Sequence, residues 1–242
     1  MALGQNALVT PRRIPDYARR IDVRTSPGRV VAEMEDYVHH FQVELEHADG
    51  VVTRAVGTGV RVPWATCPIG AAGVARLAGA KVGPETGDSW VGTDRTDQCT
   101  HVIDLAAVAV AHADRPSLRY DARVSPAGGP RRHAELRADG RLVLEWELEE
   151  DVVTRGPFAG LQVRSRELKR RMRELPDPDQ REHVAILRRA CHIAPSRAVD
   201  LDDYQVAAEI GMIDSSCHTL QPAVAGTSRR VRGSARRTEE IF

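Results

Sequence analysis

Residues 37–62 read YVHHFQVELEHADGVVTRAVGTGVRV, and this stretch decides the fold of the first half of the chain. Apolar and polar side chains alternate through residues 37–47, as they do in a strand with one buried face. Asp49-Gly50 is a tight-turn signal, and residues 51–62 supply a partner strand. The stretch therefore predicts a β-hairpin and, with it, an antiparallel sheet.

Further strands are expected on both sides of this hairpin. Upstream, alternation begins at Arg20 and continues past a turn at Ser26-Pro27-Gly28 into residues 30–35. Downstream, a second turn signal, Asp139-Gly140, and several Pro/Gly turns separate three strand-like runs, at residues 118–124, 133–136 and 142–148. The second half thus repeats the order of the first, in which strands precede helices.

The helical spacing of apolar residues predicts the remaining elements. Residues 69–80 and 98–112 are expected to form helices that pack on the first sheet, with residues 83–96 as a loop between them. Three more helices are expected, at residues 164–173, 179–192 and 201–212. We therefore expect an α+β fold, with antiparallel sheets each followed by packed helices and with a helical C-terminal part.

The expected organisation is one globule between two loose ends. Residues 1–14 are expected to be a flexible arm, and residues 15–113 a sheet-plus-helix half that carries the functional site. Residues 114–220 hold the second sheet and the C-terminal helices of the same globule. Residues 221–242 are expected to be a disordered tail, whose arginine-rich run lacks the aromatic residues typical of nucleic-acid binding.

Composition narrows the function classes. The 242 residues include 34 Lys and Arg against 34 Asp and Glu, so the overall charge does not favour nucleic acid as a partner. No apolar run approaches the roughly 20 residues that a membrane span needs. The sequence does not open with a basic region followed by an apolar core, and its four cysteines then indicate a reducing compartment. We expect a cytoplasmic protein whose partner is a small-molecule substrate.

Two short segments carry the chemistry. Cys67 and Cys99 each stand where a polar stretch gives way to a helix, and His101 follows two residues after Cys99. A helix N-terminus favours thiolate, so both cysteines are candidates for a low pKa. Asp97 is expected to cap the second helix, which would leave Cys99 in the first turn, where it can converge with His101.

The order of several motifs resembles a bacterial family known only as a domain of unknown function. The resemblance runs from about residue 20 to about residue 197. It rests on Cys67-Pro68, Cys99-Thr-His101, Ala138-Asp-Gly140 and Leu187-Arg-Arg-Ala190, which occur in this order. It implies no particular activity.

The first half is also distantly similar to iron–sulfur scaffold proteins of the IscU/NifU type. In that family an aspartate beside the first cysteine, a second cysteine before a helix and a His-Cys pair at the start of a later helix hold zinc or a cluster. Asp36, Cys67 and Cys99 fall on matching positions, and His101 supplies the histidine at a shifted place. Met34 stands where the family has its first cysteine, and Gln98 stands where the histidine precedes the last one. The resemblance implies a metal set of Asp36, Cys67, Cys99 and His101.

Three interpretations of this set stay open. Asp36, Cys67, Cys99 and His101 could hold a metal, with zinc expected and an iron–sulfur cluster as the alternative. A cysteine and His101 could instead form a metal-free catalytic pair. Alternatively, Cys67, Cys99 and His101 could all be core residues without a chemical role. Our first hypothesis is a small-molecule enzyme, in the lyase, cyclase or hydrolase classes, with these four residues catalytic. The second is a non-enzymatic metal or sulfur carrier.

Other histidines and cysteines are weaker candidates. His40 is expected to share the strand face of Asp36 and is a reserve ligand, which leaves His39 on the opposite face. Cys191 falls on the apolar stripe of a helix and is expected in the core. Cys217 lies in a polar segment that could fold back onto the site.

Overall fold

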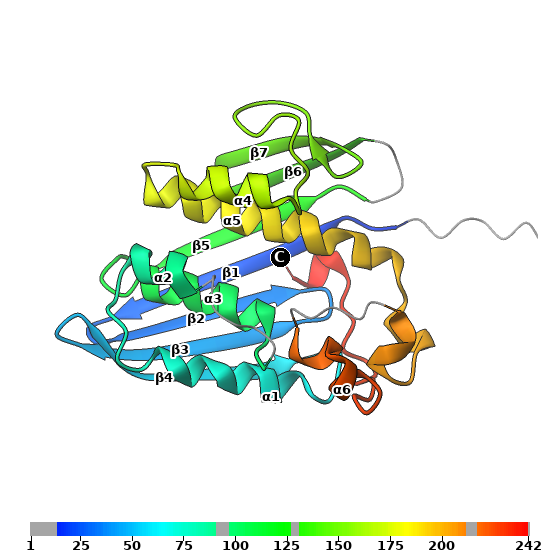
Figure 1. Cartoon of the computed structure of the whole chain (residues 1–242), viewed down its shortest axis with the longest axis horizontal. Coiled ribbons are helices and arrows are strands. Elements are labelled where there is room, and N and C mark those ends of the chain that lie inside the picture. Colours follow the sequence, from blue (N-terminus) through cyan, green and yellow to red (C-terminus); the bar gives the residue numbers. More distant parts are fainter. Residues whose placement is uncertain (1–13, 91–96, 127–130, 212–216, 242) are drawn as a thin grey trace, which may run out of the picture.

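The computed structural model describes residues 14–90, 97–126, 131–211 and 217–241. It contains one eight-stranded antiparallel sheet with the strand order β4-β3-β2-β1-β5-β6-β7-β8 (Figure 1). The strands are β1 (Tyr17–Ser26), β2 (Arg29–Asp36), β3 (His40–Ala48), β4 (Val51–Arg61), β5 (Leu118–Val124), β6 (Arg131–Ala138), β7 (Arg141–Glu149) and β8 (Val152–Val153). The expected α+β class is confirmed.

The two sheets expected from the sequence are halves of a single sheet. Pairing of β1 with β5, in which Ile21 lies opposite Tyr120, joins the halves edge to edge. Each half is built from hairpins, and the two Asp-Gly turns have the positive φ angles of type I′ turns, 51° at Asp49 and 47° at Asp139. Local turn chemistry therefore sets the hairpins, whereas the contact between β1 and β5 unites them.

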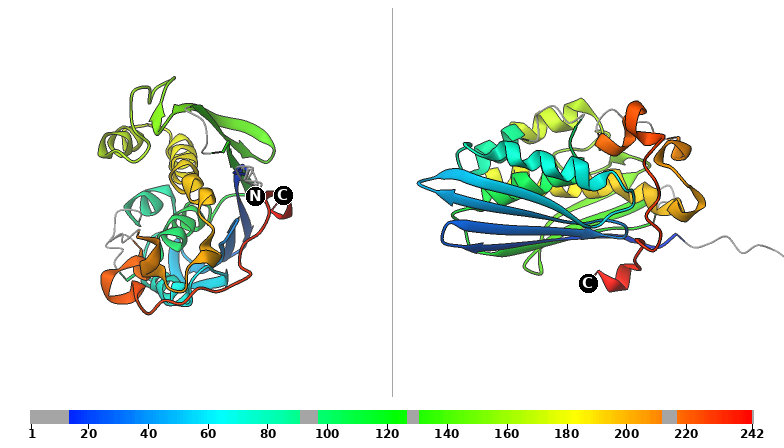
Figure 2. Two further views of the ribbon diagram at one scale, coloured as in Figure 1. Left: turned by 90° about the vertical axis from the view of Figure 1, so that its right-hand side faces the viewer. Right: turned by 90° about the horizontal axis from the view of Figure 1, so that it is seen from below.

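All the longer helices gather on one face of the sheet (Figure 2). The α-helices are α1 (Cys67–Ala71), α2 (Pro84–Trp90), α3 (Thr100–Ala111), α4 (Arg166–Arg173), α5 (Pro178–Ile193) and α6 (Pro222–Ala225). Short 3₁₀ helices are η1 (Ala72–Leu77), η2 (Ala194–Ala198), η3 (Leu201–Asp203), η4 (Ala207–Ile210), η5 (His218–Leu220) and η6 (Thr238–Glu240). Helix α3 covers the half formed by β1, β2 and β3, and α5 covers β5, β6 and β7.

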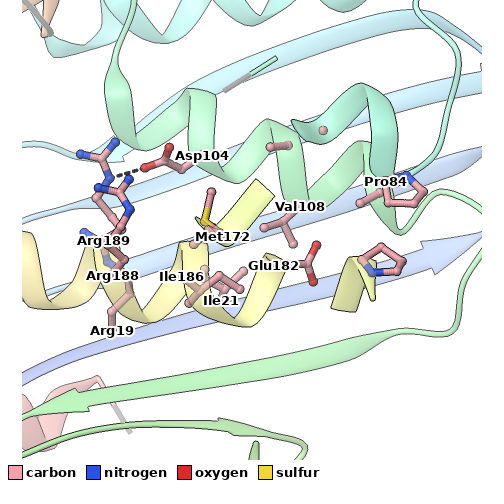
Figure 3. A pocket seen from close by; sticks show the side chains of 15 residues that line it. Arg19, Ile21, Pro84, Asp104, Val108, Met172, Glu182, Ile186, Arg188 and Arg189 are labelled. Carbon is pink, nitrogen blue, oxygen red and sulfur yellow. Dashed lines mark hydrogen bonds and ion pairs between the residues drawn. The ribbon is translucent and has the colours of Figure 1, made fainter. Parts of the chain in front are cut away.

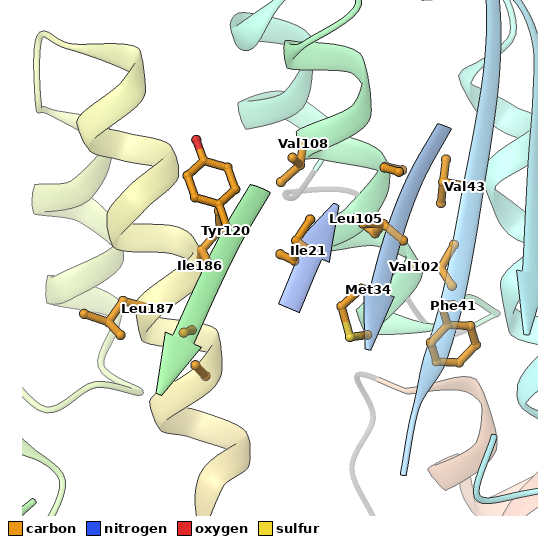
Figure 4. Close-up of a cluster of buried hydrophobic side chains, with 14 of the residues drawn as sticks. Ile21, Met34, Phe41, Val43, Val102, Leu105, Val108, Tyr120, Ile186 and Leu187 are labelled. Atoms are coloured by element: carbon orange, nitrogen blue, oxygen red, sulfur yellow. The ribbon is translucent and has the colours of Figure 1, made fainter. Parts of the chain in front are cut away.

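The core lies between the sheet and these two helices (Figure 4). Residues on alternate positions of the strands point toward the helices, so that Met34 lies between its partners Ile21 and Phe41 across three strands. Val102 and Leu105 of α3 pack on this layer and are at most 2% exposed. Burial of α3 on nearly every side explains why its sequence is apolar all round rather than along one stripe.

Several helix predictions need correction. The helix expected at residues 69–80 is the short α1 followed by η1, and α2 occupies part of the loop expected at residues 83–96. Pro84 begins α2, which is consistent with the preference of proline for the first helical turn. The helix expected at residues 201–212 consists of η3 and η4 as far as it is described, because Asp200 caps a single turn and Gly211 ends the second with a φ of 71°.

Residues 221–241 also differ from the expected disordered tail. Ala225, Ser228 and Ile241 are at most 2% exposed, and Arg229 pairs with Val206 through the backbone. Arg230 donates to the Pro63 carbonyl at 2.9 Å. Hydrogen bonds to backbone carbonyls and the burial of small residues therefore hold the arginine-rich run in place. Amino-acid composition does not reveal these contacts. The predicted flexible arm lies outside the described residues except for residue 14.

Among the residues that the structure describes, no helix is both long and apolar enough to cross a membrane.

Candidate metal centre

The register of β1 and β2 places Arg19 directly opposite Asp36 on the face covered by the helices. Tyr17 lies two residues earlier on the same face of β1. The Oδ2 atom of Asp36 accepts hydrogen bonds from Tyr17 Oη at 2.9 Å and from Arg19 Nη2 at 3.0 Å. All three side chains are buried, and Asp36 is fully inaccessible to solvent. A carboxylate in this position keeps its charge only because cationic and hydrogen-bonding groups surround it.

The other oxygen of Asp36 organises the turn between β2 and β3. Its Oδ1 atom accepts from the backbone N–H groups of Val38, at 3.1 Å, and His39, at 2.9 Å. The Nδ1 atom of His39 lies 2.9 Å from the same oxygen. Burial alone would raise the pKa of Asp36, but the hydrogen bond with His39 and the nearby Arg19 guanidinium outweigh burial and hold that pKa well below its usual range. Asp36 is therefore an anion that orients the imidazole of His39.

His101 reaches the same place from the first turn of α3. Its ring centroid lies 4.1 Å from that of His39, and the aromatic ring of Phe41 stacks nearby at 6.1 Å. His101 is 9% exposed, and its Nε2 atom is buried without a hydrogen-bond partner. Burial, together with the neighbouring His39 side chain and the positive charge of Arg19, lowers the pKa of His101 well below its ordinary value. The imidazole is consequently neutral, the form that binds metals.

Asp36, His39 and His101 therefore form one compact group. One potential ligand atom from each residue lies within 4.8 Å of the others, and in the described parts of the chain no other three His, Cys, Asp or Glu residues come this close. With Nδ1 of His39 donating to Asp36, Nε2 of that ring is left as an acceptor. Carboxylate-oriented histidines of this kind are typical of metal sites and of general-base catalysts.

The two predicted cysteines lie elsewhere. Cys67 and Cys99 are both buried, with exposures of 6% and 4%, and neither belongs to the Asp36 group. Thr219 Oγ1 donates to the sulfur of Cys67 at 3.6 Å. Burial raises the pKa of Cys67 to about 12 and raises that of Cys99 well above its ordinary value, and in both cases the nearby thiol of Cys217 adds to the effect. The prediction that a helix N-terminus lowers the pKa of these two cysteines is wrong, because the loss of solvent around each thiol outweighs that effect.

The predicted set of Asp36, Cys67, Cys99 and His101 is thus brought together only in part. Helix α3 begins at Thr100, so Cys99 is its N-cap residue, with an extended backbone (φ −83°, ψ 121°). Because the backbone changes from extended to helical after Cys99, the side chains of Cys99 and His101 point in different directions. Cys99 lies near Cys67 and Cys217, and we call the surroundings of these three residues the cysteine-containing region. The N–H of Cys99 donates there to the Gly70 carbonyl at 3.0 Å. Asp97 is not the cap of α3, whose N-cap is Cys99, and it pairs with Arg76.

His39 is the residue that the sequence prediction missed. The sequence pattern predicts one strand through residues 37–47, which would place His40 on the face of Asp36. In the structure β2 ends at Asp36 and β3 begins at His40, so residues 37–39 form a turn that folds His39 back onto the carboxylate. His40 instead lies 3.9 Å from Glu33 and is 27% exposed. An aspartate three residues before a histidine at a strand end is the available sequence signal, since such an aspartate often caps a turn.

Arg61 of β4 holds this turn from the other side. Its guanidinium donates to the backbone carbonyls of Asp36 at 2.8 Å, Tyr37 at 3.2 Å and His39 at 3.3 Å. It also donates to the Ser234 carbonyl at 2.5 Å, and it pairs with Glu35 at 2.8 Å. One arginine, whose side chain is 11% exposed, therefore connects the site to the C-terminal segment.

The structure also shows where the other two cysteines, Cys191 and Cys217, lie. Cys191 is fully buried in α5, as its place on the apolar stripe predicted. Cys217 is half-buried, and the N–H of the next residue, His218, donates to the Gln98 carbonyl at 3.0 Å. Cys217 therefore does fold back, but onto the segment of Cys67 and Cys99.

Comparison with known proteins adds no relative: no family model, no curated protein and no solved structure matches this chain. The functional argument accordingly rests on the site itself.

Proposed function

We propose that the chain is a metal-dependent enzyme acting on a small molecule, with a divalent transition-metal ion at Asp36, His39 and His101. The observation that carries the proposal is the buried Nε2 atom of His101. Among the described residues it has no hydrogen-bond partner, although an unsatisfied buried polar atom costs about 1–3 kcal/mol. It belongs to a group whose ligand atoms lie within 4.8 Å of one another.

The donor set suits such an ion. Two imidazoles and one carboxylate are ligands for zinc, iron(II) and manganese, and soft thiolates are not required. Asp36 either binds the ion or accepts the Nδ1 proton of His39, which fixes the tautomer and the ring orientation. The Arg19 guanidinium, 3.0 Å from Asp36, offsets the charge of the carboxylate, so the imidazoles carry most of the affinity.

A bound ion would act as a Lewis acid and would lower the pKa of a coordinated water. That chemistry fits the hydrolase, lyase and cyclase classes. Within the chain, His39 is the most accessible member of the group, with a side chain 13% exposed. Asp36 holds its Nδ1 proton, so that Nε2 of His39 is the atom available to a metal or to a substrate proton.

The test is metal titration of chelator-treated protein by calorimetry, with Zn²⁺, Mn²⁺ and anaerobic Fe²⁺. His39→Ala and His101→Ala should each weaken binding by more than about tenfold, as loss of a ligand or its orienting partner does. His40→Ala is the matched control, because His40 is adjacent in sequence yet lies near Glu33. Equal affinity in wild type and all three variants, or no binding to the wild type, would reject the metal proposal.

A second candidate is a metal-free general base. It is favoured by the hydrogen bonds of Asp36, whose two oxygens already face five donor groups. In this case Asp36 and His39 form a catalytic dyad, with neutral His101 beside it. Absence of metal binding would support it, together with loss of turnover in His39→Ala once a substrate is found. A non-enzymatic iron–sulfur carrier would instead be supported by iron and acid-labile sulfide in freshly purified protein.

A further inference from the structure

A second site is suggested by a cavity on the helix-covered side of β1. It has a volume of about 70 Å³ and lies between β1 and helices α2, α3, α4 and α5 (Figure 3). It is separate from the cysteine-containing region, and its wall includes Arg19, the residue that binds Asp36. The space between packed helices is a common location for ligand sites.

The body of the cavity is apolar. Its walls include Ile21 from β1, Val108 from α3, Met172 from α4 and Ile186 from α5. Figure 3 shows these four side chains grouped in the middle of the site. Its volume lies between the roughly 10–15 Å³ that one water needs and the roughly 150 Å³ of a cavity that holds benzene. A ligand body of a few carbon atoms therefore fits.

One end of the cavity is lined by more arginines than carboxylates. Arg19, Arg188 and Arg189 gather there around Asp104, at 3%, 6% and 7% exposure respectively (Figure 3). Arg189 pairs with Asp104, and Arg19 pairs with Asp36. The Nε atom of Arg19 is buried and has no hydrogen-bond partner. A buried N–H donor without a partner at the cationic end of a cavity is the feature that an anionic ligand would satisfy.

The opposite end offers no comparable attraction. Glu182 lies there, but its Oε1 atom already interacts with His112 Nε2 at 2.8 Å and with Tyr120 Oη at 2.6 Å. A ligand with one anionic head and an apolar tail therefore has a single favourable orientation, with its head toward Arg19.

We propose that this cavity binds a short-chain aliphatic monocarboxylate, with the carboxylate at the arginines and the hydrocarbon tail against Ile21, Val108 and Ile186. The proposal does not depend on the metal centre, since it rests on the cavity and its guanidinium groups. Arg19 connects the two, because the same side chain would contact the ligand and Asp36.

The test uses butyrate and its uncharged analogue butyramide as probes of the full chain. Methyl NMR should show saturable butyrate-dependent shifts at Ile21, Val108 and Ile186, and butyramide should bind at least tenfold more weakly. Ala107→Leu, which adds volume to a residue of the cavity wall, should weaken butyrate binding at least tenfold. Arg188→Met should do the same without affecting butyramide, whereas Arg24→Met, at an exposed ion pair with Glu33, is the charge-matched control.

Equal binding of butyrate and butyramide to the wild type would overturn the assignment of the anionic head. Shifts confined to surface methyl groups would overturn the assignment of the cavity. Both readings come from the wild-type protein, so they hold even if a variant fails to fold.

Discussion

The imidazole rings of His39 and His101 lie with their centroids 4.1 Å apart, although 61 positions separate the two residues in the chain. One ring comes from the turn that follows β2, and the other comes from the first turn of α3. Asp36 fixes the first ring through Nδ1, and burial keeps the second ring neutral. A pair of this kind is the reason for placing the functional centre here rather than at the cysteines.

Replacement of Asp36 should be strongly destabilising. Asp36→Asn would leave Arg19 buried without its counter-charge, and we expect a loss of about 3–5 kcal/mol in the free energy of unfolding. Urea denaturation at pH 7 measures it. Asp121→Asn is the control, because its pair with Arg20 is partly solvated, and it should cost less than about 1 kcal/mol. Similar losses in the two variants would contradict the proposed role of the buried pair.

The buried His101 should make stability fall on mild acidification of the metal-free protein. The pKa of His101 is lowered in the folded state, while the unfolded chain takes up a proton near pH 6.5. Below that pH the unfolded state binds more protons, so the free energy of unfolding should decrease by up to about 1.4 kcal/mol per pH unit.

His101→Gln should remove this part of the slope between pH 7.5 and pH 5.5. Asp36 does not contribute in that range, because its lowered pKa affects stability only at pH values below about 4. His133→Gln, at a side chain 43% exposed, is the control. An unchanged slope in His101→Gln would show that folding does not lower the pKa of His101.

Thiol reactivity should follow exposure rather than helix position. Cys217 is half-buried, whereas Cys67, Cys99 and Cys191 are buried, and burial raises the pKa of each of these three. Iodoacetamide at pH 7.5 should therefore modify Cys217 first in the native protein, with the other three protected until unfolding. Peptide mass spectrometry gives the order. Fast labelling of Cys67 or Cys99 would revive the catalytic thiolate hypothesis.

Arg61 should couple the turn to the C-terminal segment. Arg61→Met removes donors to the carbonyls of Asp36 and Ser234, so trypsin should cleave after Arg236 or Arg237 several-fold faster than in the wild type. Metal affinity should fall as well, because the backbone of His39 loses a support. Arg54→Met, at an exposed pair with Glu46, should change neither measurement. Cleavage at the wild-type rate would show that the segment is held independently of Arg61.

Local signals in the sequence were sufficient for most of the secondary structure. Alternation and the Asp-Gly turns predict the hairpins because strand faces and I′ turns depend on neighbouring residues alone. The helix around residue 105 was predicted within two residues at each end, since a long apolar run has few alternatives. The sequence predictions are wrong where a helix is short, as at α2. They are also wrong where a segment is held by hydrogen-bond acceptors far away in the sequence, as Arg230 is by the carbonyl of Pro63.

The sequence by itself determined the antiparallel hairpins, the central helix and two members of the candidate site, Asp36 and His101. Only the tertiary structure decided that the two halves share one sheet, that His39 joins the site and that Cys67 and Cys99 do not. The physical reason is that a side chain's direction depends on where its strand ends and its helix begins. Ending β2 at Asp36 turns His39 inward, and beginning α3 at Thr100 separates Cys99 from His101.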